Sequence, residues 1–233
     1  MRQVIVLATR NQGKVKELQE MLADFPVDIR SLTDFGPLPE VMEDGLTFDD
    51  NAYKKALFTA KALGLPALAD DSGLMVETLG GAPGVHSARY AADAGVGEVG
   101  DDSANIARLL KEMTGESNRR AAFVCVLSLA VPSGPALTYE GRCQGEITHK
   151  PRGNQGFGYD PVMFYPPLGK TFAEMDSVEK NLVSHRGVAI TQLREEFAKV
   201  LKWLEQRLVE DKNPKPDHRD FAHNDWSKEV MIK

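Results

Sequence analysis

The sequence predicts an α/β protein with a mixed, partly antiparallel twisted sheet flanked by helices. Short apolar runs typical of strands alternate along the chain with segments whose apolar residues recur at helical spacing. A hairpin pattern at residues 132–135 (PSGP) breaks this alternation, so part of the sheet should be antiparallel. With 233 residues, 42% of them hydrophobic, the chain can form the core of one large domain or two small ones.

The N-terminal segment predicts a strand, a polar loop and a helix. Residues 3–8 (QVIVLA) are apolar and β-branched, which is typical of a short buried strand. Asn11 is a suitable helix N-cap, and apolar residues recur at helical spacing from Val15 to Phe25. The loop at residues 9–14 therefore lies between a strand and the start of a helix.

A second helix and two short strands are predicted next. Thr47 begins the helix, Asp50 takes the acidic position of a capping box, and Gly64 ends the helix. Residues 67–69 predict a short buried strand that stops at the turn-forming sequence Asp-Asp-Ser-Gly. Residues 74–79 then predict a separate strand.

The second half of the chain predicts two helices around a pair of long strands. Asp102 or Ser103 can cap the first of these helices. Residues 120–131 and 137–149 read as the two strands of the hairpin. The last long helix follows Ser184, with apolar residues at spacings of three and four.

Composition narrows the classes of partner and the cellular location. The formal net charge of −6 argues against a protein that coats DNA or RNA. The longest apolar stretch, from Ala121 to Val131, is about half of the roughly 20 residues that a membrane-spanning helix needs. The two cysteines provide neither a disulfide framework nor zinc-ligand spacing. We therefore expect no nucleic-acid partner, no membrane partner and a cytoplasmic location.

The loop between the first strand and the first helix is a candidate phosphate-binding site. Backbone N–H groups at a helix start carry partial positive charge, a lysine adds a full charge, and a glycine allows close approach. An ordinary capped helix with a solvated lysine is the alternative interpretation. The candidate residues are Thr9, Arg10, Asn11, Gln12, Gly13 and Lys14.

Acidic residues form a second candidate group. Asp70 and Asp71 follow a buried strand, where adjacent carboxylates are costly unless cations compensate them. Since side chains alternate along a strand, one should face a cleft and the other should turn away. Glu43, in an acidic loop, could join Asp71 around Mg²⁺, which takes a few carboxylates together with phosphate oxygens. The alternative interpretation of Asp70 and Asp71 is a turn, and that of Glu43 is a solvated acidic loop.

Two segments near the C-terminal helix could bind a nucleotide base. The loop at residues 153–160 (GNQGFGYD) carries aromatic rings on which a purine could stack, with about 1–3 kcal/mol per base. The segment around residues 184–186 combines a helix N-cap with an Arg–His pair. Core packing of the aromatic residues and solvated surface charge are the alternatives. The candidate residues are Phe157, Gly158, Tyr159, Asp160, Lys180, His185 and Arg186.

Taken together, these motifs resemble the inosine triphosphate pyrophosphatase family of house-cleaning purine nucleoside triphosphatases. The resemblance covers residues 3–208, with the motifs in the family's order. One departure concerns the metal site, because Met42 replaces the first of two consecutive acids, and we place the ligand on Glu43. The matching blocks are TRNQGK at 9–14, GLTFDDNAYKKA at 45–56, ADDSG at 69–73, GGAPGVHSARY at 80–90, GFGYDP at 156–161 and EKNLVSHR at 179–186.

The resemblance implies a fold with two lobes around a central cleft, formed by a pyrophosphatase domain at residues 1–209. Residues 210–233 are highly charged and are expected to be a flexible or appended tail. The implied reaction is Mg²⁺-dependent hydrolysis of ITP, dITP and XTP to the monophosphate and pyrophosphate. The implied assembly is a homodimer. Rival readings are a pyrophosphatase of pyrimidine or modified nucleotides and a non-catalytic nucleotide- or RNA-binding module.

The resemblance also implies roles for individual residues. Asp71 is the implied catalytic carboxylate, which binds the metal together with Glu43 and orients or deprotonates the attacking water. Lys55 and Ser72 are added to the substrate-binding residues. Preference for hypoxanthine over adenine requires hydrogen-bond donors, such as Arg186, His185 or a backbone N–H, facing the keto oxygen.

Overall fold

The computed structural model describes residues 2–212 and places their strands in a seven-stranded sheet. Its spatial order is β2-β1-β3-β4-β5-β6-β7. The pairs β1–β2 and β1–β3 are parallel, and all other pairs in this sheet are antiparallel, so the predicted mixed sheet is confirmed. The strands are β1 (Gln3–Leu7), β2 (Val27–Ser31), β3 (Ala67–Val76), β4 (Arg120–Ala130), β5 (Ala136–Ile147), β6 (Met163–Tyr165) and β7 (Lys170–Thr171).

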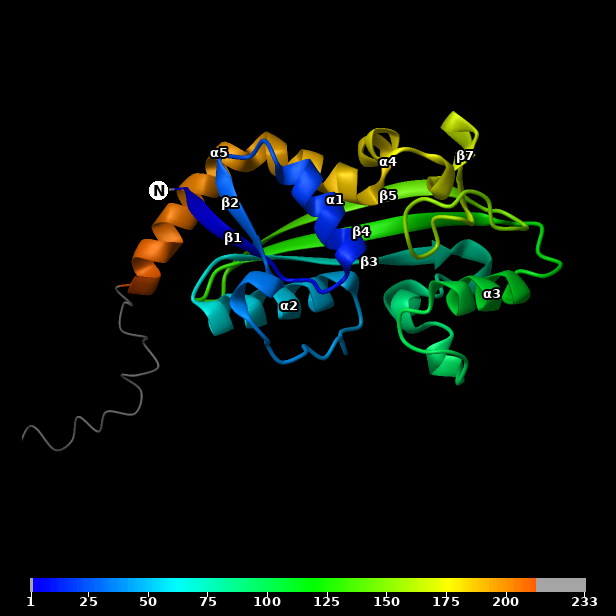
Figure 1. Cartoon of the computed structure of the whole chain (residues 1–233), viewed down its shortest axis with the longest axis horizontal. Coiled ribbons are helices and arrows are strands. Elements are labelled where there is room, and N and C mark those ends of the chain that lie inside the picture. Colours follow the sequence, from blue (N-terminus) through cyan, green and yellow to red (C-terminus); the bar gives the residue numbers. More distant parts are fainter. Residues whose placement is uncertain (1, 213–233) are drawn as a thin grey trace, which may run out of the picture.

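Helices cover both faces of the sheet. In Figure 1, α1, α4 and α5 lie on one side of it, and α2 and α3 lie on the other. Short 3₁₀ turns, η1 to η6, connect the main elements. The helices are α1 (Gln12–Leu22), α2 (Phe48–Leu63), α3 (Asp102–Glu112), α4 (Ser177–Val183) and α5 (His185–Lys212), and the 3₁₀ turns are Leu32–Phe35, Glu77–Leu79, Gly84–Arg89, Ala92–Ala94, Pro166–Leu168 and Phe172–Glu174.

The long strands β3, β4 and β5 pass through two lobes, one built with α1, α2 and α5 and the other with α3, β6 and η6. Alternate residues of β4 serve different cores: Leu127 packs with residues of α1 and α5, whereas Val126 packs against α2. Farther along the same strand, Phe123 belongs to a third core formed with α3, β6 and η6. The two lobes therefore share one sheet, and the segments between them border a common cavity.

The predicted break between separate strands at residues 67–69 and 74–79 is wrong. β3 runs without interruption from Ala67 to Val76, and β4 pairs with every residue of it, Asp70 and Asp71 included. The turn-forming tendency of Asp-Asp-Ser-Gly is overridden because the ladder with β4 satisfies the backbone and nearby cations compensate the carboxylates. The chemistry-bearing acids consequently lie in mid-strand, not in a turn.

The other differences concern short or terminal elements. The sequence did not predict β2, β6, β7 or α4. Helix α5 continues to Lys212, past the expected domain boundary at residue 209, and residues 213–233 of the expected tail lie outside the described residues. Within residues 2–212, no helix has an apolar segment long enough to cross a bilayer.

Candidate active site

A cavity of about 280 Å³ lies where the two lobes meet. It is bordered by the loop after β1, the acidic loop before α2, the centre of β3, the loop at residues 157–160 and the start of α5. Most of the residues singled out in the sequence line it, while Gln12 and Gly13 do not. Those in the lining are Thr9, Arg10, Asn11, Lys14, Glu43, Lys55, Asp71, Ser72, Phe157, Gly158, Tyr159, Asp160, Lys180, His185 and Arg186.

The predicted cap of α1 is present at the cavity edge. The Oδ1 atom of Asn11 accepts a hydrogen bond from the backbone N–H of Lys14 at 3.0 Å, and α1 begins at Gln12. The side chain of Gln12 is turned back to the carbonyl of Arg10. A Cβ atom at Gly13 would lie 2.5 Å from the ring of Phe157. Gly13 thus makes room for this ring, and its place outside the cavity lining does not support the expected close approach to a ligand.

Asp70 is the acid that turns away from the cavity. Its carboxylate is fully buried and accepts a hydrogen bond from Nε of Arg186 at 2.8 Å. Lys14 Nζ lies 2.5 Å from Oδ1 of Asp70. Burial alone would raise the pKa of Asp70, but the charges of Arg186 and Lys14 outweigh it and hold this pKa well below its usual range. Asp70 therefore remains ionised and links β3 to α1 and α5.

Asp71 lines the cavity from the opposite face of β3. Lys55 Nζ donates to Oδ1 of Asp71 at 2.7 Å and lies 3.3 Å from Oε1 of Glu43. Burial raises the pKa of Asp71, even though the charge of Lys55 acts in the other direction. The pKa of Lys55 is also raised, because the two carboxylates outweigh its burial. The predicted orientation of the two adjacent aspartates is confirmed by these contacts.

Glu43 and Asp71 are the carboxylates beside Lys55 that could hold a divalent cation. The carboxylates of Glu43 and Asp71 approach the same ammonium group, so they converge on one point of the cavity wall. No group of three or more His, Cys, Asp or Glu side chains suited to a metal occurs among residues 2–212. Two carboxylates, with the remaining positions left to water and phosphate oxygens, make the type of site that Mg²⁺ prefers.

The aromatic loop at residues 157–160 is held by polar contacts with η3, α3 and α4. Tyr159 is buried and donates from its hydroxyl to the carbonyl of Ser87 at 2.9 Å. The backbone N–H of Gly158 donates to Asp102 at 2.6 Å, and Asp160 accepts from Lys180 at 2.5 Å. Tyr159 therefore has the core position that was the alternative interpretation.

The ring of Phe157 remains available to the cavity. Lys180 Nζ lies 4.8 Å from its centroid, and the Arg186 guanidinium carbon lies 5.9 Å from it. The ring therefore presents a flat apolar surface beside two cations. A planar base could stack on such a surface.

His185 is a buried, neutral residue. Its ring stacks on Phe123 with centroids 4.8 Å apart and planes at 27°. Burial first, and the neighbouring Arg186 second, hold the pKa of His185 well below its usual value. Its Nδ1 atom is buried and has no hydrogen-bond partner among residues 2–212. Of the Arg–His pair in the sequence, only Arg186 therefore carries a charge. His185 lines the cavity as a neutral residue.

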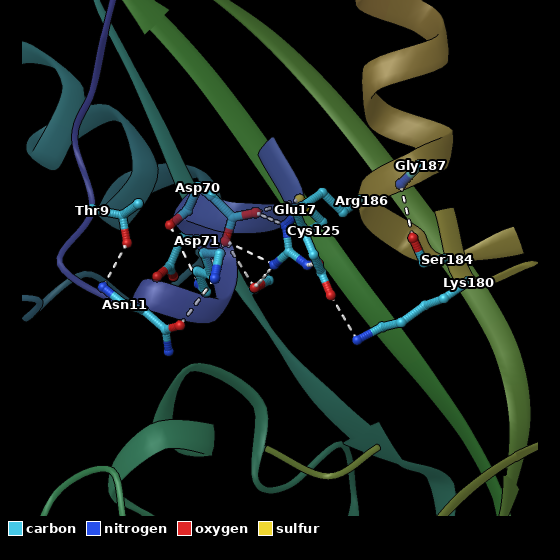
Figure 2. A network of polar contacts seen from close by, with 12 residues as sticks. Thr9, Asn11, Glu17, Asp70, Asp71, Cys125, Lys180, Ser184, Arg186 and Gly187 are labelled. Carbon is cyan, nitrogen blue, oxygen red and sulfur yellow. Dashed lines mark hydrogen bonds and ion pairs between the residues drawn. The ribbon is translucent and has the colours of Figure 1, made fainter. Parts of the chain in front are cut away.

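A carboxylate that the sequence did not single out joins two of these cations. Glu17 of α1 lies 2.7 Å from Lys180 Nζ and accepts a hydrogen bond from Nη1 of Arg186 (Figure 2). Its spacing of three residues from Lys14 on a predicted helix was the available signal, because residues at that spacing share a helix face.

Comparison with known proteins identifies the family. The Ham1 family profile matches residues 5–196. The chain belongs to the Ham1 family. A protein of Desulfotalea psychrophila named dITP/XTP pyrophosphatase is 58% identical to this Ham1 chain over 97% of it and 99% of the relative. A protein of Syntrophobacter fumaroxidans with the same name is 60% identical over 89% of this chain and 88% of the relative.

Solved structures of Ham1 proteins have the same fold. The Ham1 protein of Coxiella burnetii matches with a TM-score of 0.76 and 42% identity, over 84% of this chain and 99% of that one. The Staphylococcus aureus Ham1 protein matches with a TM-score of 0.74 and 39% identity, again over 84% and 99%. The predicted family resemblance and fold class are thereby confirmed.

Two further residues of this Ham1 chain border the cavity without having been predicted. Arg89, in the short η3 segment, lines it and donates from Nη2 to the carbonyl of Glu43 at 3.4 Å. Asp102 lines it at the start of α3. Arg89 belongs to the block at residues 80–90, to which no site role was assigned. Asp102 was considered only as a helix cap together with Ser103, and this prediction is wrong because Asp101 caps α3.

Proposed function

We propose that this Ham1-family chain hydrolyses dITP, ITP and XTP to the monophosphate and pyrophosphate, and so removes non-standard purines from the nucleotide pool. One structural observation carries this proposal: a single cavity joins the acid–lysine group of Asp71, Glu43 and Lys55 to the ring of Phe157. The names of the Desulfotalea psychrophila and Syntrophobacter fumaroxidans relatives support the substrate class.

The triphosphate is assigned to the side of the cavity nearest the start of α1. Lys14 and Lys55 border it together with Thr9, Arg10 and Asn11 of the loop that leads into α1. At an effective dielectric constant of about 20, each pair of opposite charges about 4 Å apart contributes roughly 4 kcal/mol before desolvation. Several such pairs are required because the protein as a whole has a net charge of −6.

Asp71 is assigned the role of general base. Lys55 binds its Oδ1, and Oδ2 accepts a proton from water as the water oxygen bonds to the α-phosphorus. The bond from this phosphorus to the bridging oxygen of the β-phosphate breaks, and pyrophosphate leaves with the electron pair. Mg²⁺ held by Asp71 and Glu43 would supply positive charge that stabilises the leaving pyrophosphate.

Base selection is assigned to the part of the cavity that Phe157, His185 and Arg186 line. Hypoxanthine and xanthine present a keto oxygen where adenine presents an amino group. Donors from Arg186 or His185 pair with the keto oxygen, and beside adenine each would be left unpaired at a cost of about 1–3 kcal/mol. We further propose, from the family resemblance, that the enzyme is a cytoplasmic homodimer.

A substrate panel tests this function against the two rival readings. Pyrophosphate release is measured with ITP, XTP, GTP, ATP, dTTP and UTP, with Mg²⁺ and with a chelator. The proposal requires the highest kcat/KM on ITP and XTP, and loss of turnover with the chelator. Higher efficiency on dTTP or UTP would support a pyrimidine-nucleotide pyrophosphatase, and no release from any substrate would support a binding module.

A further inference from the structure

Glu17 links two cations that belong to different segments of the cavity wall. Its Oε1 lies 2.7 Å from Lys180 Nζ, and its Oε2 accepts from Nη1 of Arg186. The side chains are 13% exposed for Glu17, 7% for Lys180 and 1% for Arg186, so the contacts are largely shielded from water. Buried ion pairs of this kind are far less screened than surface pairs, and their geometry is held more tightly.

The hydrogen bonds of Arg186 leave little freedom for its guanidinium group. This group has five N–H donors in a fixed plane. Nε donates to Asp70 at 2.8 Å, and Nη2 donates to Asp70 at 3.3 Å and to Ser72 at 3.1 Å. Nη1 donates to Glu17, and its second N–H has no acceptor among residues 2–212. Since Arg186 also lines the cavity, this second N–H is the guanidinium donor left for a ligand to accept.

We infer that Glu17 is a positioning residue for base selection. This inference rests on the proposed function. By holding Nη1, it fixes the direction of the last free N–H of Arg186, the donor for a purine keto oxygen. By holding Lys180, it also fixes the cation 4.8 Å from the centroid of Phe157, on which the base stacks. One carboxylate thereby places the donor of Arg186 and the cation beside the stacking ring relative to each other.

The charge balance of the network requires this carboxylate. Glu17, Asp70 and Asp160 face the cations Lys14, Lys180 and Arg186 in a chain of ion pairs. Without Glu17, Lys180 and Arg186 lose a shared counter-ion and repel each other. The guanidinium then keeps its contacts with Asp70 and Ser72 through Nε and Nη2, but its plane can tilt about them, so the direction of Nη1 is no longer fixed.

A purely structural role is the competing explanation, because Glu17 also ties α1 to α4 and α5. Arg194 provides a matched control. Its Nη2 donates to the carbonyl of Met21 at 2.9 Å, and its guanidinium lies 4.6 Å from the ring centroid of Phe25. Arg194 therefore ties α5 to the same helix and the segment that follows it, but it does not line the cavity.

The test compares kcat/KM for dITP and dATP in the wild-type enzyme and in Glu17→Gln, Glu17→Asp and Arg194→Met. Dissociation constants of the products dIMP and dAMP, measured by calorimetry, give a readout that does not depend on turnover. We expect Glu17→Gln to lower the dITP-to-dATP ratio of kcat/KM by about tenfold, chiefly through lower efficiency on dITP. Glu17→Asp should give an intermediate ratio, since its carboxylate is one methylene shorter, and Arg194→Met should leave the ratio unchanged.

An equal loss on both substrates in Glu17→Gln, or the same fall in the ratio in Arg194→Met, would overturn the inference. If Glu17→Gln does not fold, Glu17→Asp alone decides: a wild-type ratio overturns the inference, and a lower ratio with weaker dIMP binding supports it. A wild-type enzyme with no preference for dITP would overturn the proposed function and this inference with it. A preference that persists unchanged in the folded Glu17 variants would overturn the inference alone.

Discussion

Asp70 and Asp71 are neighbours in β3, yet they take part in two separate charge networks. Asp70 is fully buried and bound to Arg186 and Lys14 on the side of α1 and α5. Asp71 lines the cavity and is bound to Lys55 on the side of α2. The alternation of side chains along a strand therefore assigns the structural task to one acid and the chemical task to the other.

Replacement of Asp71 by asparagine is expected to abolish most turnover and preserve the fold. The variant keeps the size of the side chain but removes the proton acceptor and one of the two carboxylates near Lys55. A positioned general base contributes about 10²–10⁴-fold to a rate, so kcat should fall by at least that order. Steady-state kinetics and thermal melting measure the two effects. Near-normal kcat would remove Asp71 from this role.

Replacement of Asp70 by asparagine is expected to lower the free energy of unfolding. The change leaves Arg186 and Lys14 without the carboxylate that compensates them in a buried position. Removal of one member of a buried ion pair costs about 3–5 kcal/mol, which urea unfolding can measure. Asp28→Asn is the control, because the Asp28–Arg30 pair is exposed and its loss should change stability little. Equal effects of the two substitutions would contradict the network described here.

Burial of neutral His185 predicts that stability decreases as the pH is lowered. The pKa of His185 is held below its usual value in the folded protein, so below about pH 6.5 the unfolded chain binds a proton that the folded chain does not. The free energy of unfolding should therefore fall by up to about 1.4 kcal/mol per pH unit as the pH drops below 6.5. The measurement is urea unfolding at a series of pH values.

His185→Gln should flatten this dependence, whereas His149→Gln, at an exposed position, should leave it as in the wild type. A His185→Gln variant that keeps the wild-type slope would show that the dependence has another source.

Gly13 offers a test of the Phe157 surface. An alanine Cβ at this position would lie 2.5 Å from the ring and displace it, while the substitution favours the helix itself. Gly13→Ala should therefore retain or raise the melting temperature and increase KM for dITP about fivefold or more, since base stacking contributes about 1–3 kcal/mol. Gln12→Ala, one residue earlier and outside the cavity lining, should leave KM unchanged. An unchanged KM in Gly13→Ala would argue against stacking on Phe157.

The sequence predicted the parts of the molecule that depend on local patterns. The N-caps at Asn11 and Thr47 and the hairpin of β4 and β5 are present, because each follows from neighbouring residues alone. The course of β3 through residues 70–73 was missed, because it depends on pairing with β4 and on cations from distant segments. Glu17 was missed for the same reason: its partners lie more than 150 positions later in the chain.

The site residues show the same difference between what local sequence indicates and what only the fold brings together. The chemical types of Asp71 and Glu43 identified them as candidates, and the family resemblance added Lys55, but only the fold shows that both carboxylates meet the same lysine. Tyr159 and Asp160 were grouped with Phe157 because they are adjacent in sequence. Their hydrogen bonds to Ser87 and Lys180 show that they support the loop, while Phe157 has the ring beside the cations.

The most direct test of the central claim is the identity of the products formed from dITP. Chromatography of a reaction with Mg²⁺ should show dIMP and pyrophosphate in equal amounts. Product should be absent when a chelator is present and greatly reduced when Asp71 is replaced by asparagine. Formation of dIDP and orthophosphate would place the cleavage at the wrong phosphorus. That result, or intact dITP after incubation with the wild-type enzyme and Mg²⁺, would contradict the function proposed for this cavity.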